Sequence, residues 1–255
     1  MTADRHEATI LAIDTATTQV VIATGSPDGA LRAGSTWTAG YRHGETLLPG
    51  IERFLDAYGM GRADLAGIVV GTGPGAFTGL RVGIATAKGL AHGLGIPLVG
   101  VSTAEALISS AAADPAAAAE AAEAAGPAAA QRAAAHDGVD PSRFVLLVPA
   151  GPSDRVMIRA GTEPRLLAGG LDPELDPATI LLAVDLAGRA PQAAVALGEA
   201  ARQGLGAALL RAGATRLRAA PRATGELAEL VPSYVTLPRG VATTGGTMSW
   251  SRDPH

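Results

Sequence analysis

The chain has 255 residues, of which 47% are hydrophobic but only 3% aromatic, and a formal net charge of −4. This length suits one large or two small domains with an interior filled mainly by alanine, valine and leucine. The absence of cysteine excludes disulfides, a thiolate zinc site and a thiol nucleophile. The mildly acidic balance argues against a protein whose main task is to grip nucleic acid. With polar first residues and no apolar run of roughly 20 residues, we expect neither signal peptide nor membrane helix, and hence a cytoplasmic protein.

The first hundred residues predict an α/β unit with strand hairpins at one edge of the sheet and parallel strands beyond them. Apolar runs bounded by turn residues indicate the strands, and an apolar stripe at helical spacing indicates the first helix. The sequence Ser-Thr-Ala-Glu at 102–105 is a capping box that opens another helix. In chain order, the predicted elements are strands at 8–14, 19–25 and 30–38, a helix at 45–58, a strand at 66–70, a helix at 78–94, a strand at 97–101 and a helix at 102–112.

The stretch 71–94 is the most distinctive part of the chain, a glycine-rich loop followed by a long helix. The loop matches neither a P-loop nor a dinucleotide fingerprint, so a tight turn is favoured over a phosphate site. Along the helix, small residues recur every four positions and therefore share one face. Because each glycine weakens a solvated helix by roughly 1 kcal/mol, we expect that face to let another backbone come close. The stripe consists of Gly79, Gly83, Ala87 and Ala91.

A second α/β region is predicted after an alanine-rich insertion. We expect strands at 143–148, 155–160 and 193–197, and helices beginning at Asp176 and covering 199–211 and 223–230. The last residues are polar and glycine-rich, which predicts a loose tail. The domain organisation expected from these breaks is an N-terminal domain at 1–108, the insertion at 109–140, a smaller second domain at 141–221, a C-terminal helix and return segment at 222–239, and the tail at 240–255.

Asp14 is the first candidate for chemistry, because it ends the first strand, where open sheets place ligand-binding residues. Together with the hairpin near Gly151 it would hold a magnesium nucleotide between two domains. However, the turn 15–18 contains no glycine that would let a phosphate approach, and Pro149 stands where a carboxylate would be needed. We therefore expect no active nucleotide hydrolysis by this chain alone.

His43 and Glu45 are the candidates for a metal site. A helical metal site needs a second ligand at i+4, and that position is Leu47. We therefore expect a surface or capping role for His43. No Ser/His/Asp set with a G-x-S-x-G elbow is present.

Four strings in the first half resemble the TsaB (YeaZ) family: ILAIDT at 10–15, HGETLLP at 43–49, GPGAFTGLR at 73–81 and GIPLVGVS at 95–102, with PSY at 232–234 near the end. The resemblance implies the actin/Hsp70-like (ASKHA, RNase H-like) fold of two related α/β domains. It covers residues 8–108 well. The second half departs from the family pattern, since 149–157 reads PAGPSDRVM and 111–140 has no clear counterpart.

The resemblance implies a non-catalytic subunit in making N6-threonylcarbamoyladenosine at position 37 of tRNAs that read ANN codons. Its partner would be TsaD, the paralogue that transfers the threonylcarbamoyl group. TsaE, an ATPase, would join them, TsaC would supply threonylcarbamoyl-AMP, and tRNA would be contacted only indirectly. ATP and metal would belong to the partner subunits, and the chain would carry no cofactor, metal ligand or catalytic residue of its own. Leu47, in place of the second histidine of the TsaD metal motif, fits this non-catalytic branch.

The same resemblance implies a heterodimer with TsaD, or a homodimer, built from the helices at 45–58 and 78–94. The implied interface residues are Leu47, Leu48, Ile51, Leu55, Gly79, Arg81, Gly83 and Ala87. A vestigial nucleotide site would consist of Asp14, Thr15, Gly73 and Gly75. Two alternatives stay open, a small-molecule kinase of the same superfamily and a metallopeptidase related to the zinc-bearing relatives.

Overall fold

The computed structural model describes residues 8–40, 42–114, 140–171, 173–219, 230–234, 241–244 and 247–250. Its first sheet has the strand order β3-β2-β1-β4-β5, with β1 antiparallel to β2 and parallel to β4. Every predicted strand of this region is confirmed to within two residues at each end. The five strands are β1 (Thr9–Asp14), β2 (Gln19–Gly25), β3 (Leu31–Thr38), β4 (Leu65–Gly71) and β5 (Leu98–Val101).

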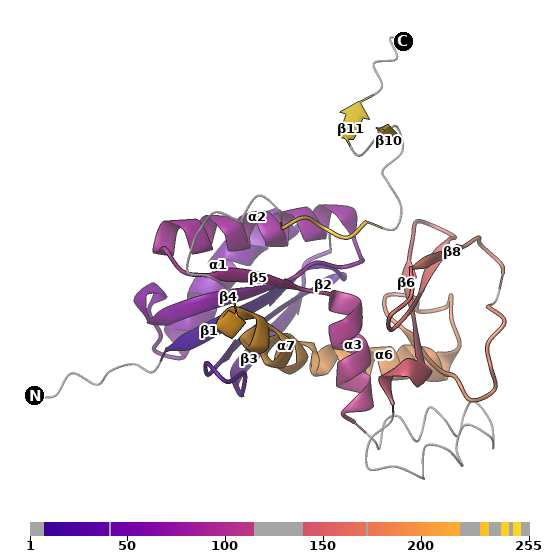
Figure 1. Cartoon of the computed structure of the whole chain (residues 1–255), viewed down its shortest axis with the longest axis horizontal. Coiled ribbons are helices and arrows are strands. Elements are labelled where there is room, and N and C mark those ends of the chain that lie inside the picture. The colour runs from indigo at the N-terminus through magenta and orange to yellow at the C-terminus, as the bar shows by residue number, and fades with distance from the viewer. Residues whose placement is uncertain are drawn as a thin grey trace, which may run out of the picture.

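Helices cover both faces of this sheet, because successive side chains along each buried strand point to opposite sides. Leu11, Ile13 and Ile22 pack in one core cluster with α1 (His43–Ala57) and α2 (Phe77–Leu94). Alternate residues such as Ala12 and Val21 face a second cluster, which includes α7 (Leu205–Ala219). Figure 1 shows α2 and α7 on opposite sides of the sheet.

The second sheet repeats the connectivity of the first. Its order is β8-β7-β6-β9, with β6 antiparallel to β7 and parallel to β9, as β1 is to β2 and β4. The predicted α/β fold with two related sheets is thereby confirmed. The strands are β6 (Phe144–Pro149), β7 (Arg155–Arg159), β8 (Arg165–Leu167) and β9 (Ile180–Ala183).

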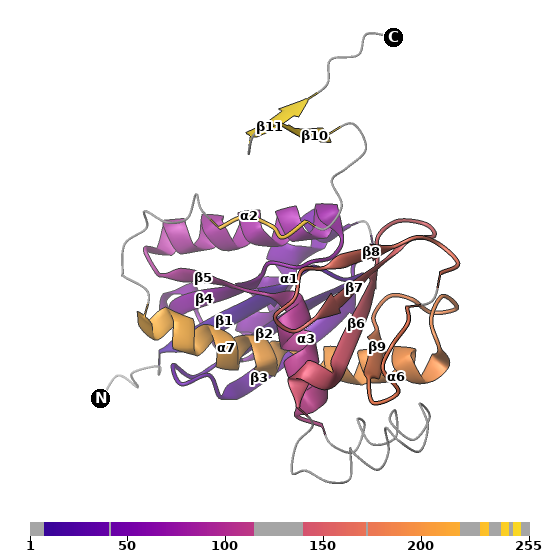
Figure 2. The ribbon, with the colours of Figure 1, turned by 45° about the vertical axis from the view of Figure 1, so that its right-hand side comes forward.

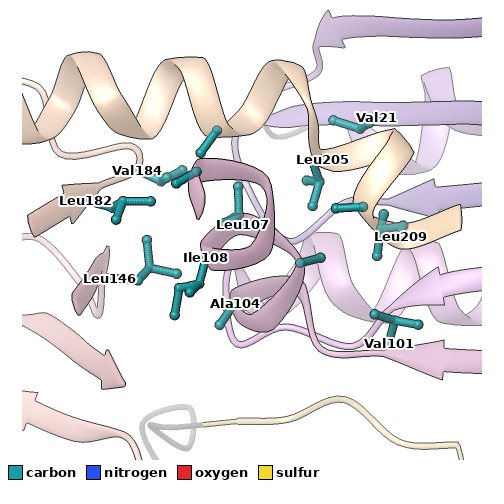
Figure 3. Close-up of a cluster of buried hydrophobic side chains, with 14 of the residues drawn as sticks. Val21, Val101, Ala104, Leu107, Ile108, Leu146, Leu182, Val184, Leu205 and Leu209 are labelled. Atoms are coloured by element: carbon teal, nitrogen blue, oxygen red, sulfur yellow. The ribbon is translucent and has the colours of Figure 1, made fainter. Parts of the chain in front are cut away.

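Helix α3 (Thr103–Ala112) joins the two sheets into one core. Leu107 and Ile108 are 1% and 2% exposed and belong to a cluster that contains residues of both sheets. Figure 3 shows α3 between Leu146 and Leu182 of the second sheet and Leu205 and Leu209 of α7. Figure 2 shows the same helix between the two sheets. Because the core is continuous across the boundary, the relative position of the sheets depends on apolar packing.

Several expectations for the second region are wrong. Asp176 opens no helix. Its carboxylate accepts a hydrogen bond from Ala178 N at 2.7 Å, a local turn that leads into β9. The strand expected at 193–197 lies within α6 (Gln192–Gln203), because a short apolar run fits either element and packing decides. The helix expected at 199–211 is the end of α6 and the start of α7, and α7, placed in the second domain by sequence, packs on the first sheet.

The C-terminal part also differs from expectation. Instead of a loose tail throughout, β10 (Val241–Thr244) and β11 (Thr247–Trp250) form a two-stranded antiparallel hairpin, drawn apart from the two sheets in Figures 1 and 2. Most of the alanine-rich insertion and the helix expected at 223–230 lie outside the described residues. In the part of the chain that the structure describes, no helix is both long and apolar enough to cross a membrane.

Candidate functional site

Asp14, the last residue of β1, is completely enclosed. Its Oδ1 accepts a hydrogen bond from Ala16 N at 2.9 Å, and its Oδ2 accepts one from the Thr103 hydroxyl at 2.6 Å. Gly71 lies so close that a Cβ placed on it would stand 1.8 Å from Asp14 Oδ2. Thr103 Oγ1 in turn accepts from Gly73 N at 3.0 Å. The end of β4, the glycine loop and the start of α3 therefore close around this carboxylate.

Burial raises the pKa of the Asp14 carboxyl to about 6, although the hydrogen bonds from Thr103 and from Ala16 N act to lower it. Removal from water disfavours the charged form, and no cationic side chain touches the carboxylate among the described residues to compensate. A carboxylate that serves a metal nucleotide must be open to it, whereas Asp14 is 0% exposed. Its role in this structure is to hold α3 and the glycine loop against the end of β1.

The glycines of the 71–75 loop allow close contact with the chain's own backbone. A Cβ on Gly75 would lie 2.1 Å from Ala16 O, the oxygen that accepts a 2.7 Å hydrogen bond from Ala76 N. Gly73 has φ +91°, which L side chains rarely adopt. Of the four residues expected in a vestigial nucleotide site, Asp14 is linked to Gly73 through Thr103. Thr15 instead contacts Gly79, and Gly75 contacts Ala16.

The small-residue stripe of α2 faces inward, contrary to the expectation that it faces a second chain. A Cβ on Gly79 would lie 2.2 Å from Thr15 O, and one on Gly83 would lie 2.1 Å from Thr15 Oγ1. The Thr15 hydroxyl donates to Gly79 O at 2.8 Å. Ala87 is fully buried as well. The stripe therefore lets α2 sit directly on the β1–β2 turn.

Three of the expected interface residues on α1 are also internal. Leu47, Ile51 and Leu55 are 1–3% exposed and pack with the strands of the first sheet. Of the predicted set, the residues that reach solvent are Leu48, 44% exposed, and Arg81, whose guanidinium lies 5.1 Å from the centre of the Phe77 ring. Contact of these helices with a partner stays a prediction, and it must use their outer faces.

The outer face of α2 carries a second small-residue stripe that the sequence analysis missed. Ala85, Gly89 and Gly93 recur every four residues and are exposed. A Cβ on Gly89 or Gly93 would meet no atom of the described residues within 4 Å. On α1, Gly44 and Leu48 are also exposed, and a Cβ on Gly44 would lie 3.9 Å from Val82 Cγ2 of α2. The sequence signal for this second stripe is the same period of four, offset by two positions from the stripe that faces inward. We call Gly44, Leu48, Ala85, Gly89 and Gly93 the outer face.

His43 is 3% exposed, and its Nε2 lies 3.2 Å from Thr17 O. The surface or capping role expected for it is wrong, because the side chain is buried against Thr17 of the β1–β2 turn and α1 has no side-chain cap hydrogen bond. Glu45 is exposed and pairs with Arg42 at 2.8 Å. Among the residues that the structure describes, no group of three or more His, Cys, Asp or Glu side chains is arranged to hold a metal ion.

Asp185 is a site residue that the sequence analysis did not find. It follows β9 and Val184 and is hydrogen-bonded to Thr18, in the β1–β2 turn, and to Arg202, in α6. The signal was available, since the apolar run 180–184 ends in a carboxylate as β1 does. The expected helix at 176 obscured it.

Comparison with known proteins places the chain. Residues 38–125 match the family model of TsaD, tRNA N6-adenosine threonylcarbamoyltransferase. An uncharacterized protein of Mycobacterium tuberculosis is 42% identical over 100 residues, 39% of this chain and 47% of that protein. The tRNA threonylcarbamoyladenosine biosynthesis protein TsaB of Escherichia coli is 40% identical over 94 residues, 37% of this chain and 40% of that protein. The match thus spans less than half the length of these relatives.

The solved structure of YeaZ from Pseudomonas aeruginosa has a TM-score of 0.50 with this chain, at 22% identity, over 89% of this chain and 100% of that one. At this identity the likeness concerns the fold. Together with the sequence matches, it confirms the resemblance inferred from the motifs. The chain is a relative of the TsaB (YeaZ) proteins, similar in sequence over somewhat more than a third of its length and in fold over most of it.

Proposed function

We propose that this chain is a non-catalytic subunit that binds a TsaD-like protein and supports N6-threonylcarbamoyladenosine modification of tRNAs reading ANN codons. The chain would reach a TsaE-like ATPase and tRNA through that complex, and the partner subunits would hold ATP and metal. The similarity to TsaB names the process. The observation that carries the partnering role is the outer face of α1 and α2, which lies within the segment that matches the TsaD family model.

The outer face suits helix-on-helix packing with another chain. Gly89 and Gly93 leave the backbone of α2 open, and glycine in a solvated helix interior costs roughly 1 kcal/mol relative to alanine. Among the described residues that cost has no compensating contact, because no atom of theirs lies within 4 Å of a Cβ at either position. A partner helix that approaches closely would compensate for it by packing against the exposed backbone and Leu48. Two helices from each chain would then form a four-helix interface.

The enclosure of Asp14 supports the non-catalytic part of the proposal. The alternative small-molecule kinase requires a carboxylate at this strand end to reach a metal nucleotide, and the geometry around Asp14 does not fit such a group. The metallopeptidase alternative requires a second ligand near His43, where Leu47 is in the core. Neither alternative gains support from the described residues.

The test uses the full chain and the TsaD relative of the same organism. Gly89→Leu should weaken their association by about 1–3 kcal/mol, or roughly 5- to 150-fold in Kd, because the new side chain holds the helices apart. The unfolding midpoint of the isolated variant should stay near that of the parent chain. Gly34→Leu, an exposed glycine on β3 away from both helices, is the matched control and should bind normally.

Unchanged association of Gly89→Leu with the TsaD relative would contradict the proposed interface. Robust ATP turnover by the isolated chain, abolished by Asp14→Ala, would contradict the non-catalytic role. If the chain forms homodimers alone, sedimentation of the same variants tells whether both assemblies use the outer face.

A further inference from the structure

Asp185 links the two sheets at the open end of the β1–β2 turn. One carboxylate oxygen accepts a hydrogen bond from Thr18 N at 2.7 Å, and the other accepts one from the Thr18 hydroxyl at 2.6 Å. The second oxygen also pairs with Arg202 Nη1 at 2.8 Å. Thr18 and Asp185 are 167 residues apart in the chain. The contact therefore joins the first sheet to the second by charge-assisted hydrogen bonds.

The donors around this carboxylate form a set that suits an oxyanion. A backbone N–H, a hydroxyl and a guanidinium converge on it, and Arg202 has a side chain only 6% exposed. The same guanidinium also pairs with Glu199, whose side chain is 48% exposed. Removal of Asp185 would leave Nη1 of a nearly buried cation without this acceptor, whereas the two Thr18 donors belong to an exposed residue. A nearly buried cation is costly to leave unpaired away from water.

The backbone of Asp185 is shaped for this contact. Its φ is +56°, and it is the only residue other than glycine with positive φ among those the structure describes. This left-handed conformation costs an L residue of order 1 kcal/mol, although Asp tolerates it better than most. Asp185 comes just after β9, at the carboxyl end of a parallel strand pair, and faces a turn that leaves the end of β1. Open α/β sheets place ligands at such ends.

Other donors of the β1–β2 turn are also occupied by acceptors from the chain. Ala16 N donates to Asp14 Oδ1 at 2.9 Å, and Gln19 N donates to Thr17 Oγ1 at 3.2 Å. Asp185 differs from these acceptors because it comes from the second sheet. Its contact therefore ties the turn to a residue 167 positions away in the chain.

We infer that Asp185 is a built-in anion, which occupies an oxyanion position formed by Thr18 and Arg202 and latches the two sheets together there. The position takes the chemistry of a phosphate group, and the carboxylate excludes that group while the latch is closed. This inference concerns the chain by itself and stands independently of the proposed TsaD partnership.

The test compares the parent chain with Asp185→Gly, because glycine adopts φ +56° without strain. Thermal unfolding is followed in inorganic phosphate and in chloride at matched ionic strength. The variant should lose stability in chloride and regain part of it in phosphate, beyond any gain of the parent chain, since a ligand of the folded state raises its stability. Calorimetric titration of the variant should show phosphate binding about tenfold or more tighter than that of the parent chain.

Glu199→Gln is the matched control, since it removes a negative charge from the same guanidinium but leaves the latch in place. It should gain no phosphate binding. Asp185→Gly/Arg202→Met should lose the phosphate effect, because the guanidinium is gone. A parallel titration with AMP tells whether the position takes the free ion only or also an esterified phosphate, and binding of either supports the inference.

If phosphate affects Asp185→Gly and the parent chain equally, the inference is overturned. Should Asp185→Gly be too unstable to handle, Asp185→Ala also removes the carboxylate from the oxyanion position, and a phosphate-dependent gain in its unfolding midpoint is the same test. Failure of these experiments would leave association with a TsaD relative unaffected, so the two proposals are distinguishable.

Discussion

The two faces of α2 carry the same kind of residue for opposite reasons. On the inner face, Gly79 and Gly83 pack directly against Thr15. A Cβ added to either glycine would lie 2.1–2.2 Å from an atom of that residue. On the outer face, Gly89 and Gly93 have no atom within 4 Å of that position. The inner glycines therefore serve the fold of this chain, and the outer ones leave room that no described residue fills.

Gly83→Leu should have the largest effect, because it disrupts the packing of the inner face of α2 against Thr15. Its Cβ alone would lie 2.1 Å from Thr15 Oγ1, so α2 must move off the β1–β2 turn. Overpacking of this kind typically costs 1–3 kcal/mol, and a leucine at so closed a position should cost at least about 3 kcal/mol. Urea unfolding of the isolated chain measures this loss of stability. A variant as stable as the parent chain would mean that the helix is not seated as described.

Asp14→Asn tests the burial of the carboxylate at the end of β1, beside the turn that the inner face of α2 covers. The folded pKa of about 6 lies above the ordinary value of 3.8, so the folded state keeps a proton that the unfolded state loses between these values. Stability contributed by Asp14 is therefore present at low pH and is lost as pH rises towards 6, by about 3 kcal/mol at most. Asparagine resembles the protonated form and removes this loss.

The variant should therefore be more stable than the parent chain at pH 7.5, and the gap should close near pH 4. Unfolding midpoints across that range test it. Asp28→Asn is the control, because Asp28 is exposed and its pKa is lowered by the hydrogen bond from Ser26, so no gain at neutral pH is expected. A pH-independent difference between Asp14→Asn and the parent chain would contradict the assignment.

Gly89→Ala should have the smallest effect and the opposite sign. Alanine removes the helix penalty of glycine, about 1 kcal/mol, and its methyl group meets no neighbour. The isolated chain should become slightly more stable. Gly79→Ala gains the same helix propensity but places its Cβ 2.2 Å from Thr15 O, so it should lose stability. Thermal unfolding of both variants measures the two changes in stability. A change of the same sign in both would contradict the distinction between the two faces of α2.

Much of the first region follows from local sequence. Alternating apolar runs and the capping box locate its strands and α3, and α2 begins within one residue of its predicted start. The structure of the second region follows less well from local sequence. Its short apolar runs fit either a strand or a helix, and the strand β9 was concealed by an Asp-Pro pair that forms a turn.

The sequence by itself determined that α2 bears small residues every four positions and that a carboxylate ends the first strand. Only the tertiary structure decided which stripe faces inward, because a period of four generates more than one such stripe and packing selects among them. The same holds for the carboxylates. Asp14 is closed in by Thr103, 89 residues away, and Asp185 meets Thr18 across 167 residues. Contacts between residues so distant in the chain arise when two sheets and the helix between them pack into one core, and no local pattern encodes them.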